Sequence, residues 1–179
     1  MSSAECLEFW FSAESEPYWF QKSPEFDRRV AECLGDLAAA AALGALDRWQ
    51  ETAEGSLALV LLLDQVPRNL YRNSTKAYAQ DEKARAVARH ALALGQDLRV
   101  PPERRFFLYM PLEHSESLAD QYLSVALFGA LPNRELVKWA EAHLVLIERY
   151  GRFPHRNAVL GRQSTPDENA YLAEDGAGF

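Results

Sequence analysis

The sequence predicts an all-α protein, an antiparallel array of about eight helices, and three observations support this fold class. No stretch shows sustained alternation of apolar and polar residues with β-branched side chains, the pattern typical of strands. Apolar residues instead recur at helical spacing, bounded by glycine, proline and capping side chains. Short turns join these segments, and such turns place successive helices antiparallel.

Two helices are expected near the N-terminus, the first over residues 4–12. Ser23 supplies an N-cap hydroxyl and Pro24 suits a first helical turn, so the second is expected over residues 24–43. Gly44 ends it, because glycine readily adopts the left-handed conformation that closes a helix.

The most apolar segment, residues 57–63, predicts a central buried helix because it offers no polar face to water. We expect this helix to stop before Pro67, since the residue that precedes a proline is pushed away from helical geometry. A further helix is expected over residues 78–94, ended by Gly95.

The second half of the chain contains the same kinds of residues at the expected helix ends. A short helix is expected over residues 102–110, and a longer one, capped by Ser115 or Ser117, ends near residue 131. Asparagine and glycine bound another helix over residues 134–150. Finally, a threonine at 165 and a glutamate at 168 form a capping box that opens a brief last helix.

Length and charge narrow the classes of function. One domain, residues 1–179, is expected, since domains most often have about 100–150 residues. The net charge of −7 disfavours binding to nucleic acid or to an anionic membrane surface. No apolar run approaches the roughly 20 residues of a membrane span, and acidic residues follow the N-terminus, so a cytoplasmic protein without a signal peptide is expected.

A first polar motif, DQVPRN, follows the most apolar helix. Its structural explanation is that Arg68 and Asn69 donate hydrogen bonds to free carbonyls at the helix end, while Asp64 pairs with Arg68. Its functional explanation puts these side chains and Gln65 on a pocket wall, where the arginine fork binds a carboxylate or phosphate. Both explanations stay open.

A second motif, PLEHSESLADQ, lies in the middle of the chain. In one continuous helix Glu113, Glu116 and Asp120 would share a face. His114 titrates near neutral pH, and a carboxylate beside it would raise its pKa and suit it for acid–base catalysis. The alternative is a helix N-terminus, where acidic side chains and the Ser115 hydroxyl are stabilising.

The third motif, YGRFPHRN followed by GRQSTPDE, is the densest polar cluster. It leads into a helix N-terminus, whose free amides favour anions, so it could form an anion-binding wall. The alternative is an arginine-rich loop paired with Glu113, Glu116 or Asp64 in a buried structural network. The side chains concerned are Arg152, His155, Arg156, Asn157 and Arg162.

These three motifs, together with the aromatic clusters FWF and WF near the start of the chain, closely resemble a bacterial family catalogued as domain of unknown function 924. The resemblance extends over nearly the whole chain, with the motifs in the same order. It implies a fold like the tetratricopeptide superhelix. Val66 stands where the family usually has phenylalanine, a change that removes no polar group. The family has no established activity, so the resemblance assigns no reaction.

Together the motifs predict a site for an anionic small molecule. The predicted catalytic residues are His114 as the acid–base group, Glu116 and Asp64. The predicted ligand-binding residues are Gln65, Arg68, Asn69, Glu113, Arg152, His155, Arg156, Asn157 and Arg162. If the protein is an enzyme, proton transfer or hydrolysis of an anionic substrate is the expected reaction class.

Two alternatives remain at this point. A tetratricopeptide-like fold commonly holds peptides in its groove, in which case the arginines would clamp a peptide carboxylate. The polar motifs could also be only a structural network that holds helix ends together. No cofactor is expected and no residue is assigned to a metal, because no Glu-x-x-His motif occurs. His114 with Glu113 or Glu116 is the combination that could still ligate an ion.

The C-terminal segment carries one further hypothesis. The chain ends in Gly176-Ala177-Gly178-Phe179, which is short and flexible and is tipped by an aromatic ring and a carboxylate. It could fold back and plug the predicted site, with the Phe179 carboxylate on an arginine.

Overall fold

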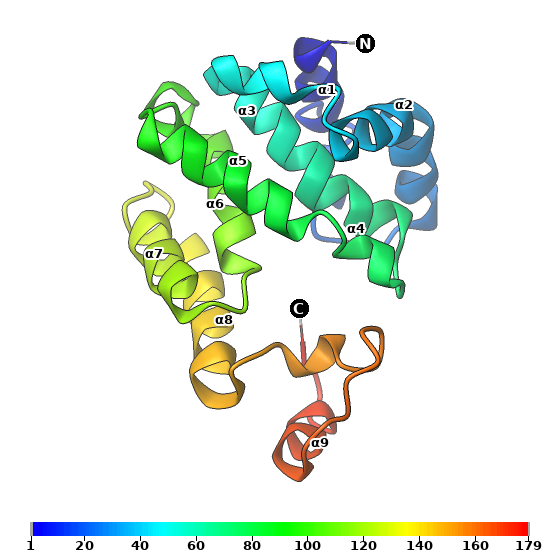
Figure 1. The fold of residues 1–179 in the computed structure, drawn as a ribbon, viewed down its shortest axis with the longest axis vertical. Helices are drawn as coiled ribbons and strands as arrows, with labels where there is room; N and C mark the ends of the chain where they lie inside the picture. The colour runs from blue at the N-terminus through cyan, green and yellow to red at the C-terminus, as the bar shows by residue number, and fades with distance from the viewer. Residues whose placement is uncertain (1, 179) are drawn as a thin grey trace. The chain divides into compact units, whose positions relative to one another are not determined.

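A computed structural model describes residues 2–178, which form helices joined by turns, with no strand among them (Figure 1). This confirms the predicted all-α helical array. The described residues divide into two compact units. The N-terminal unit comprises residues 2–72 and Lys76–Pro111, and the C-terminal unit comprises Asn73–Thr75 and residues 112–178. The single domain expected from chain length and the tetratricopeptide likeness stay predictions.

The N-terminal unit holds the longest apolar segment of the chain. Residues 57–63 are all at most 2% exposed, which confirms the predicted buried central helix. This segment begins in α3, which packs against α1 and α5. The helices of the unit are α1 (Ser3–Trp10), α2 (Pro24–Ala42), α3 (Ala53–Val60), α4 (Val66–Leu70), α5 (Asp81–Ala93) and most of α6 (Pro102–Glu113).

The central helix does not stop before Pro67, so that prediction is wrong. The chain passes from α3 through a π-helical turn, Leu61–Gln65, directly into α4, which contains the proline. In a regular α-helix the Pro67 ring would collide with the carbonyl four residues earlier. The wider turn, in which the Val66 N–H donates to the Leu61 carbonyl, relieves that collision and lets the helix continue.

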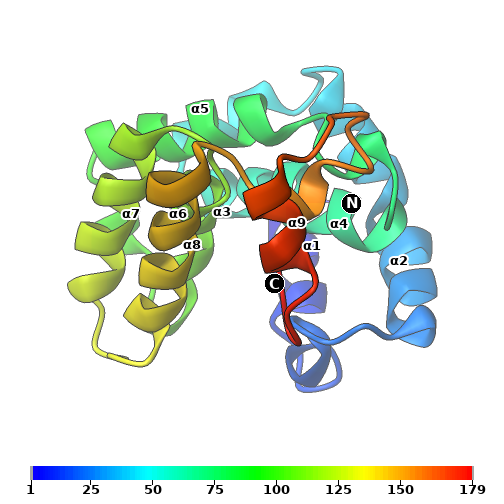
Figure 2. The same ribbon diagram turned by 90° about the horizontal axis from the view of Figure 1, so that it is seen from below.

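In the C-terminal unit, α7 (Leu118–Gly129) and α8 (Leu136–Tyr150) lie side by side as a hairpin (Figures 1 and 2). A segment with one short 3₁₀ turn, Pro154–Arg156, separates α8 from α9 (Pro166–Leu172). A small apolar cluster in the C-terminal unit consists of Leu146, Ile147 and Phe153, with Tyr150 and Tyr171 packed against them.

Two helix ends in this unit follow the predicted signals, whereas α8 begins at Leu136 with Glu135, and not the predicted asparagine, at its N-cap. Gly151 closes α8 at φ 68°, in the left-handed region where glycine has no steric penalty. The Thr165 hydroxyl accepts the Glu168 N–H, and the Glu168 carboxylate accepts the Thr165 N–H, so the predicted capping box is confirmed. No helix in the described part of the chain is long and apolar enough to span a membrane.

The capping box makes the first testable prediction. Replacing Thr165 by alanine removes the hydroxyl that caps α9, and should cost about 1 kcal/mol of unfolding free energy. For a chain of this size that corresponds to a melting temperature lower by roughly 2–4 °C, measurable by calorimetry. Thr75→Ala, at an exposed threonine outside the α-helices, is the matched control and should change little. Equal melting temperatures for the two variants would contradict the assigned cap.

Candidate functional site

The first polar motif lies in the N-terminal unit, and its side chains are bonded to one another and to neighbouring helices. The Arg68 Nη1 donates to the Asp64 backbone oxygen at 2.6 Å and lies 3.3 Å from the Asp64 Oδ1. The same guanidinium binds both carboxylate oxygens of Asp81, at 3.0 and 3.1 Å. The predicted pairing of Asp64 with Arg68 is thus confirmed, and the Arg68 guanidinium also satisfies a carbonyl of the π-helical turn.

The other members of this motif also have internal partners. The Gln65 Nε2 donates to the fully buried Asp64 carboxylate at 2.6 Å. The Asn69 Nδ2 donates to Asp27 on α2 at 2.8 Å, and Arg72 binds the same carboxylate. Arg68 binds a backbone carbonyl as predicted, whereas Asn69 binds a carboxylate instead, but each polar side chain of the motif has a partner within this unit.

The second motif is not one continuous helix, so Glu113, Glu116 and Asp120 do not share a helical face. The helix α6 ends at Glu113, and α7 begins at Leu118. The bend between them is held by Gln121, whose Nε2 donates to the backbone oxygens of Glu113 and Ser115 at 2.6 and 2.7 Å. The three carboxylates consequently point to three different partners.

Polar side chains of the motif reinforce this bend. The Ser115 hydroxyl donates to the Asp120 carboxylate at 2.7 Å and accepts the Ser117 N–H at 3.2 Å. Ser117 occupies the N-cap position of α7, as predicted, but makes no side-chain cap hydrogen bond. The bend presents Glu113, His114 and Glu116 within four consecutive residues.

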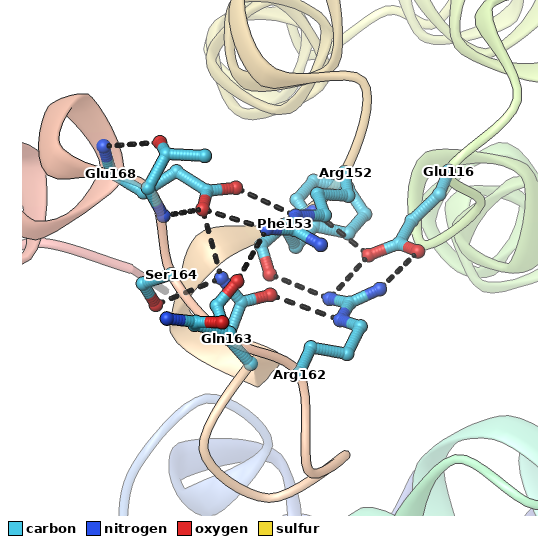
Figure 3. A network of polar contacts seen from close by, with 9 residues as sticks. Glu116, Arg152, Phe153, Arg162, Gln163, Ser164 and Glu168 are labelled. Carbon is cyan, nitrogen blue, oxygen red and sulfur yellow. Dashed lines mark hydrogen bonds and ion pairs between the residues drawn. The ribbon is translucent and has the colours of Figure 1, made fainter.

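Glu116 and Arg162 form a bidentate ion pair, the Glu116–Arg162 clamp (Figure 3). The two bonds measure 2.8 and 3.0 Å. The clamp also holds the backbone of Phe153, whose N–H donates to Glu116 at 2.8 Å and whose carbonyl accepts from Arg162 at 3.0 Å. Burial alone would raise the pKa of Glu116, but the Arg162 guanidinium and the Phe153 N–H lower it below its ordinary value.

A second bidentate pair joins Arg152 to Glu168, at 2.6 and 2.8 Å (Figure 3). Arg152 also donates to the Gln163 carbonyl, and the Asn157 amide donates to Glu168 at 3.2 Å. These bonds to the charged form lower the pKa of Glu168 to about 2, the Arg152 guanidinium contributing most. The glutamate that caps α9 is therefore also the anchor of the third motif.

Three further polar side chains of the unit, those of His143, His155 and Arg156, pack around the Phe153 ring. The buried Arg156 lies over its face, 4.6 Å from the ring centroid, and the His143 and His155 rings lie 5.5 and 5.6 Å away. Burial lowers the pKa of His143 to about 3, with the charge of His114 adding to the effect. Burial and the charge of Arg156 lower the pKa of His155 to about 4. Both imidazoles are consequently neutral at neutral pH.

His143 was not among the predicted site residues, yet it lies beside Glu113 and His114. The ligand atoms of these three side chains can be chosen to lie within 4.8 Å of one another. The sequence contains one signal for it, because Ala140, His143 and Ile147 recur at helical spacing on the buried face of α8. A histidine in such a stripe is most often an ordinary core residue, so this signal alone does not indicate a site.

An open pocket of about 530 Å³ lies beside the Glu116–Arg162 clamp, and the residues that line it all belong to the C-terminal unit. Two of the predicted ligand-binding residues, His155 and Arg162, are on its wall. The lining residues are Pro154, His155, Ala158, Arg162, Gln163, Ser164, Asn169 and Leu172. Sequence reasoning did not single out Gln163, Ser164 or Asn169, which carry the amide and hydroxyl groups of the wall.

The C-terminal segment folds back onto the C-terminal unit as far as Gly178. The Gly178 N–H donates to the Tyr171 hydroxyl at 2.9 Å. A Cβ at Gly178 would lie 3.2 Å from the Cβ of His155, so the backbone packs directly on that side chain. The hypothesis that the Phe179 carboxylate binds an arginine lies outside the described residues.

The predicted site residues therefore form two sets. Eight of them belong to the C-terminal unit, and there the structure brings together the second and third motifs through the Glu116–Arg162 clamp. The eight are Glu113, His114, Glu116, Arg152, His155, Arg156, Asn157 and Arg162. The other four, Asp64, Gln65, Arg68 and Asn69, belong to the N-terminal unit, and their convergence with the first set stays a prediction.

The Arg152–Glu168 pair predicts a particular dependence of stability on pH. Because the folded state lowers the pKa of Glu168 from 4.5 to about 2, its stabilisation is complete above pH 4.5 and is lost as the pH falls toward 2. Glu168→Gln should lower the unfolding free energy at neutral pH by about 1.5–3 kcal/mol. It should also make the unfolding free energy depend less on pH below 4.5.

Denaturant titrations between pH 2 and pH 7 measure both effects. Asp167→Asn is the matched control, because the neighbouring Arg149–Asp167 pair is exposed, with side chains 52% and 61% accessible. Such pairs contribute about 0–1 kcal/mol. A Glu168→Gln variant no less stable than Asp167→Asn would contradict the anchoring role of Glu168.

The fold-back of the C-terminal segment also has a testable consequence. Deleting residues 176–179 should expose His155 and remove the Gly178 bond to Tyr171, which lowers the melting temperature. Tyr171→Phe removes only that bond and should cost about 0.5–1.5 kcal/mol. Thermal melts of both variants check this, and a truncated chain as stable as the full-length chain would show that the contact contributes nothing.

Comparisons with known proteins agree with the resemblance seen in the sequence. A solved structure of a protein of unknown function, ATU0120 from Agrobacterium tumefaciens, is 42% identical, covers 96% of each chain and superposes with a TM-score of 0.91. No curated protein matches the chain. The family model for "Bacterial protein of unknown function (DUF924)" matches residues 6–176. The chain belongs to this bacterial family of unknown function, DUF924.

Proposed function

We propose that the C-terminal unit binds a small organic anion in the pocket beside the Glu116–Arg162 clamp. The observation that carries the proposal is the chemistry of the wall, where Arg162 and His155 stand among the side chains of Gln163, Ser164 and Asn169. The pocket volume of about 530 Å³ falls in the usual range for small-molecule sites, about 300–1,000 Å³. A metabolite-sized ligand is therefore favoured over an ion or a polymer.

The charges near the pocket favour a ligand with one anionic group. Four of the five N–H groups of Arg162 bond to Glu116, Phe153 and Asn157, and the remaining one, on Nη1, bonds to no described residue. Glu116 neutralises much of this guanidinium, so the wall would hold a single carboxylate or phosphate better than a polyanion. The buried Arg156 adds positive potential behind His155.

If the bound molecule is a substrate, His114 is the acid–base group that we propose. Glu116 is held ionised by both guanidinium bonds and does not suit proton transfer. Asp64 belongs to the other unit, where Arg68 and Gln65 bind it. His114 is partly exposed, and its charge acts on His155 in the pocket wall. Proton transfer or hydrolysis of an anionic substrate is the corresponding reaction class.

A thermal-shift screen of full-length protein against small carboxylates and phosphate esters tests the proposal. A ligand at one hundred times its Kd should stabilise the protein by about 2.7 kcal/mol, which raises the melting temperature by roughly 5–10 °C. Gln163→Ala and Asn169→Ala, at exposed wall residues, should reduce the shift without unfolding the chain. Arg156→Ala and His114→Ala should reduce it as well.

Glu141→Gln, at an exposed position on α8 away from the wall, is the control and should keep the full shift. The proposal is overturned if no anion in the panel stabilises the protein, or if the shift persists unchanged in the Gln163 and Asn169 variants.

The second candidate is a peptide-interaction module whose polar motifs form a structural network. It is favoured by one observation, that Arg152 and Arg162 are each engaged by a carboxylate of the same chain. Screening short peptides with free carboxyl ends in the same assay separates the candidates, because only this second function predicts stabilisation by peptides alone.

A further inference from the structure

We propose that Glu113, His114 and His143 bind one divalent transition-metal ion of the zinc type. One ligand atom from each side chain lies within 4.8 Å of the other two. None of the three side chains is on the pocket wall, so metal binding can be tested without the proposed anion. If the ion binds, His114 is one of its ligands and not the acid–base group. This site adds His143 to the combination of His114 and Glu113 that the sequence left open.

The donor set suits such an ion. Two imidazole nitrogens and one carboxylate form the ligand set of hydrolytic zinc sites, in which a fourth position stays open for water or substrate. The same set with open positions also holds non-haem iron. Hard cations such as Mg²⁺ and Ca²⁺ prefer oxygen ligands, so the two imidazoles exclude them.

The geometry requires only a small adjustment. Bonds of about 2.0–2.2 Å place the ligands of a tetrahedral ion roughly 3.4 Å apart, so ligand atoms that lie up to 4.8 Å apart must approach by at most about 1.4 Å. Glu113 and His143 are 3% and 6% exposed and are held in place by their surroundings. His114 follows the last residue of α6 and is partly exposed, so it is the group that can move.

A backbone contact fixes the tautomer of His143. Its Nδ1 lies 2.8 Å from the Trp139 backbone oxygen, and a carbonyl oxygen can only accept. The Nδ1 therefore carries the proton and the Nε2 carries the lone pair, the arrangement that fixes metal-binding histidines. The His114 ring lies near the His143 ring, with the centroids 6.0 Å apart and the planes tilted by 53°.

Glu113 is positioned from the backbone. The Gln121 side chain binds the carbonyls of Glu113 and Ser115, the residues on either side of His114. Neither bond uses the Glu113 carboxylate, which lies 3.6 Å from the His143 Nδ1. The amide thus fixes two ligands of the proposed site without competing for them.

One neighbouring charge opposes a cation here. Arg156 is close enough for its charge to act on His143. The Glu113 carboxylate offsets it, and an anionic group in the open position of the metal would be attracted to Arg156. The site is therefore suited to an ion that keeps an exchangeable anionic ligand.

Titration of tag-free, chelator-treated, full-length protein with Co²⁺ tests the proposal. We expect one Co²⁺ per chain, with the strong visible absorption of four- or five-coordinate cobalt, and displacement by one equivalent of Zn²⁺. His114→Ala should weaken binding at least about tenfold, as should Glu113→Gln, which preserves the shape of the side chain and removes its charge.

His90→Ala is the matched control, because His90 is an exposed histidine on α5 in the N-terminal unit, and it should leave cobalt binding unchanged. Circular dichroism verifies the fold of each variant, and His114→Gln replaces His114→Ala if the latter unfolds. Wild-type protein without the visible absorption, or affinity equal in the Glu113, His114 and wild-type proteins, overturns the proposal. Since no organic ligand is present, this outcome is independent of the anion screen.

Discussion

The Glu116–Arg162 clamp is the constraint on which the C-terminal unit depends. The segment between α8 and α9 has little regular structure of its own, and the clamp fixes it through the N–H and the carbonyl of Phe153. A bidentate pair with both backbone contacts satisfied avoids the cost of a partly buried charge. Because the Phe153 ring then supports Arg156 and two imidazoles, one ion pair positions most of the chemistry proposed for this unit.

Some residues of the polar motifs hold the backbone in place, and others are the candidate site residues. The sequence of a motif does not distinguish the two roles. Gln121 and Asp120 hold the bend between α6 and α7, while Glu113 and His114 are presented by that bend. Glu168 caps α9 and anchors Arg152 with the same carboxylate. Structural pairing therefore creates the scaffold beside which the pocket and the histidine cluster lie.

Several structural features that depend on residues close together in the sequence were predicted correctly, and features that depend on distant residues were not. The capping box at Thr165 and the closing glycine at 151 act within a few residues, so their patterns predicted helix ends correctly. The bend after Glu113 depends on Gln121, and the role of His143 depends on packing between α8 and the end of α6, which no local pattern records. The wall of the pocket likewise comes from loop residues with no periodicity.

The π-helical turn at Leu61–Gln65 has a consequence for chain register. A π turn accommodates one residue more than the α-helix it interrupts, and each added residue rotates all that follows by about 100° around the helix axis. Arg68 and Asn69 meet Asp81 and Asp27 at the rotation that this turn sets. In evolutionary terms, the length of the chain in this turn, and not only the kind of residue in it, decides which carboxylates these side chains meet.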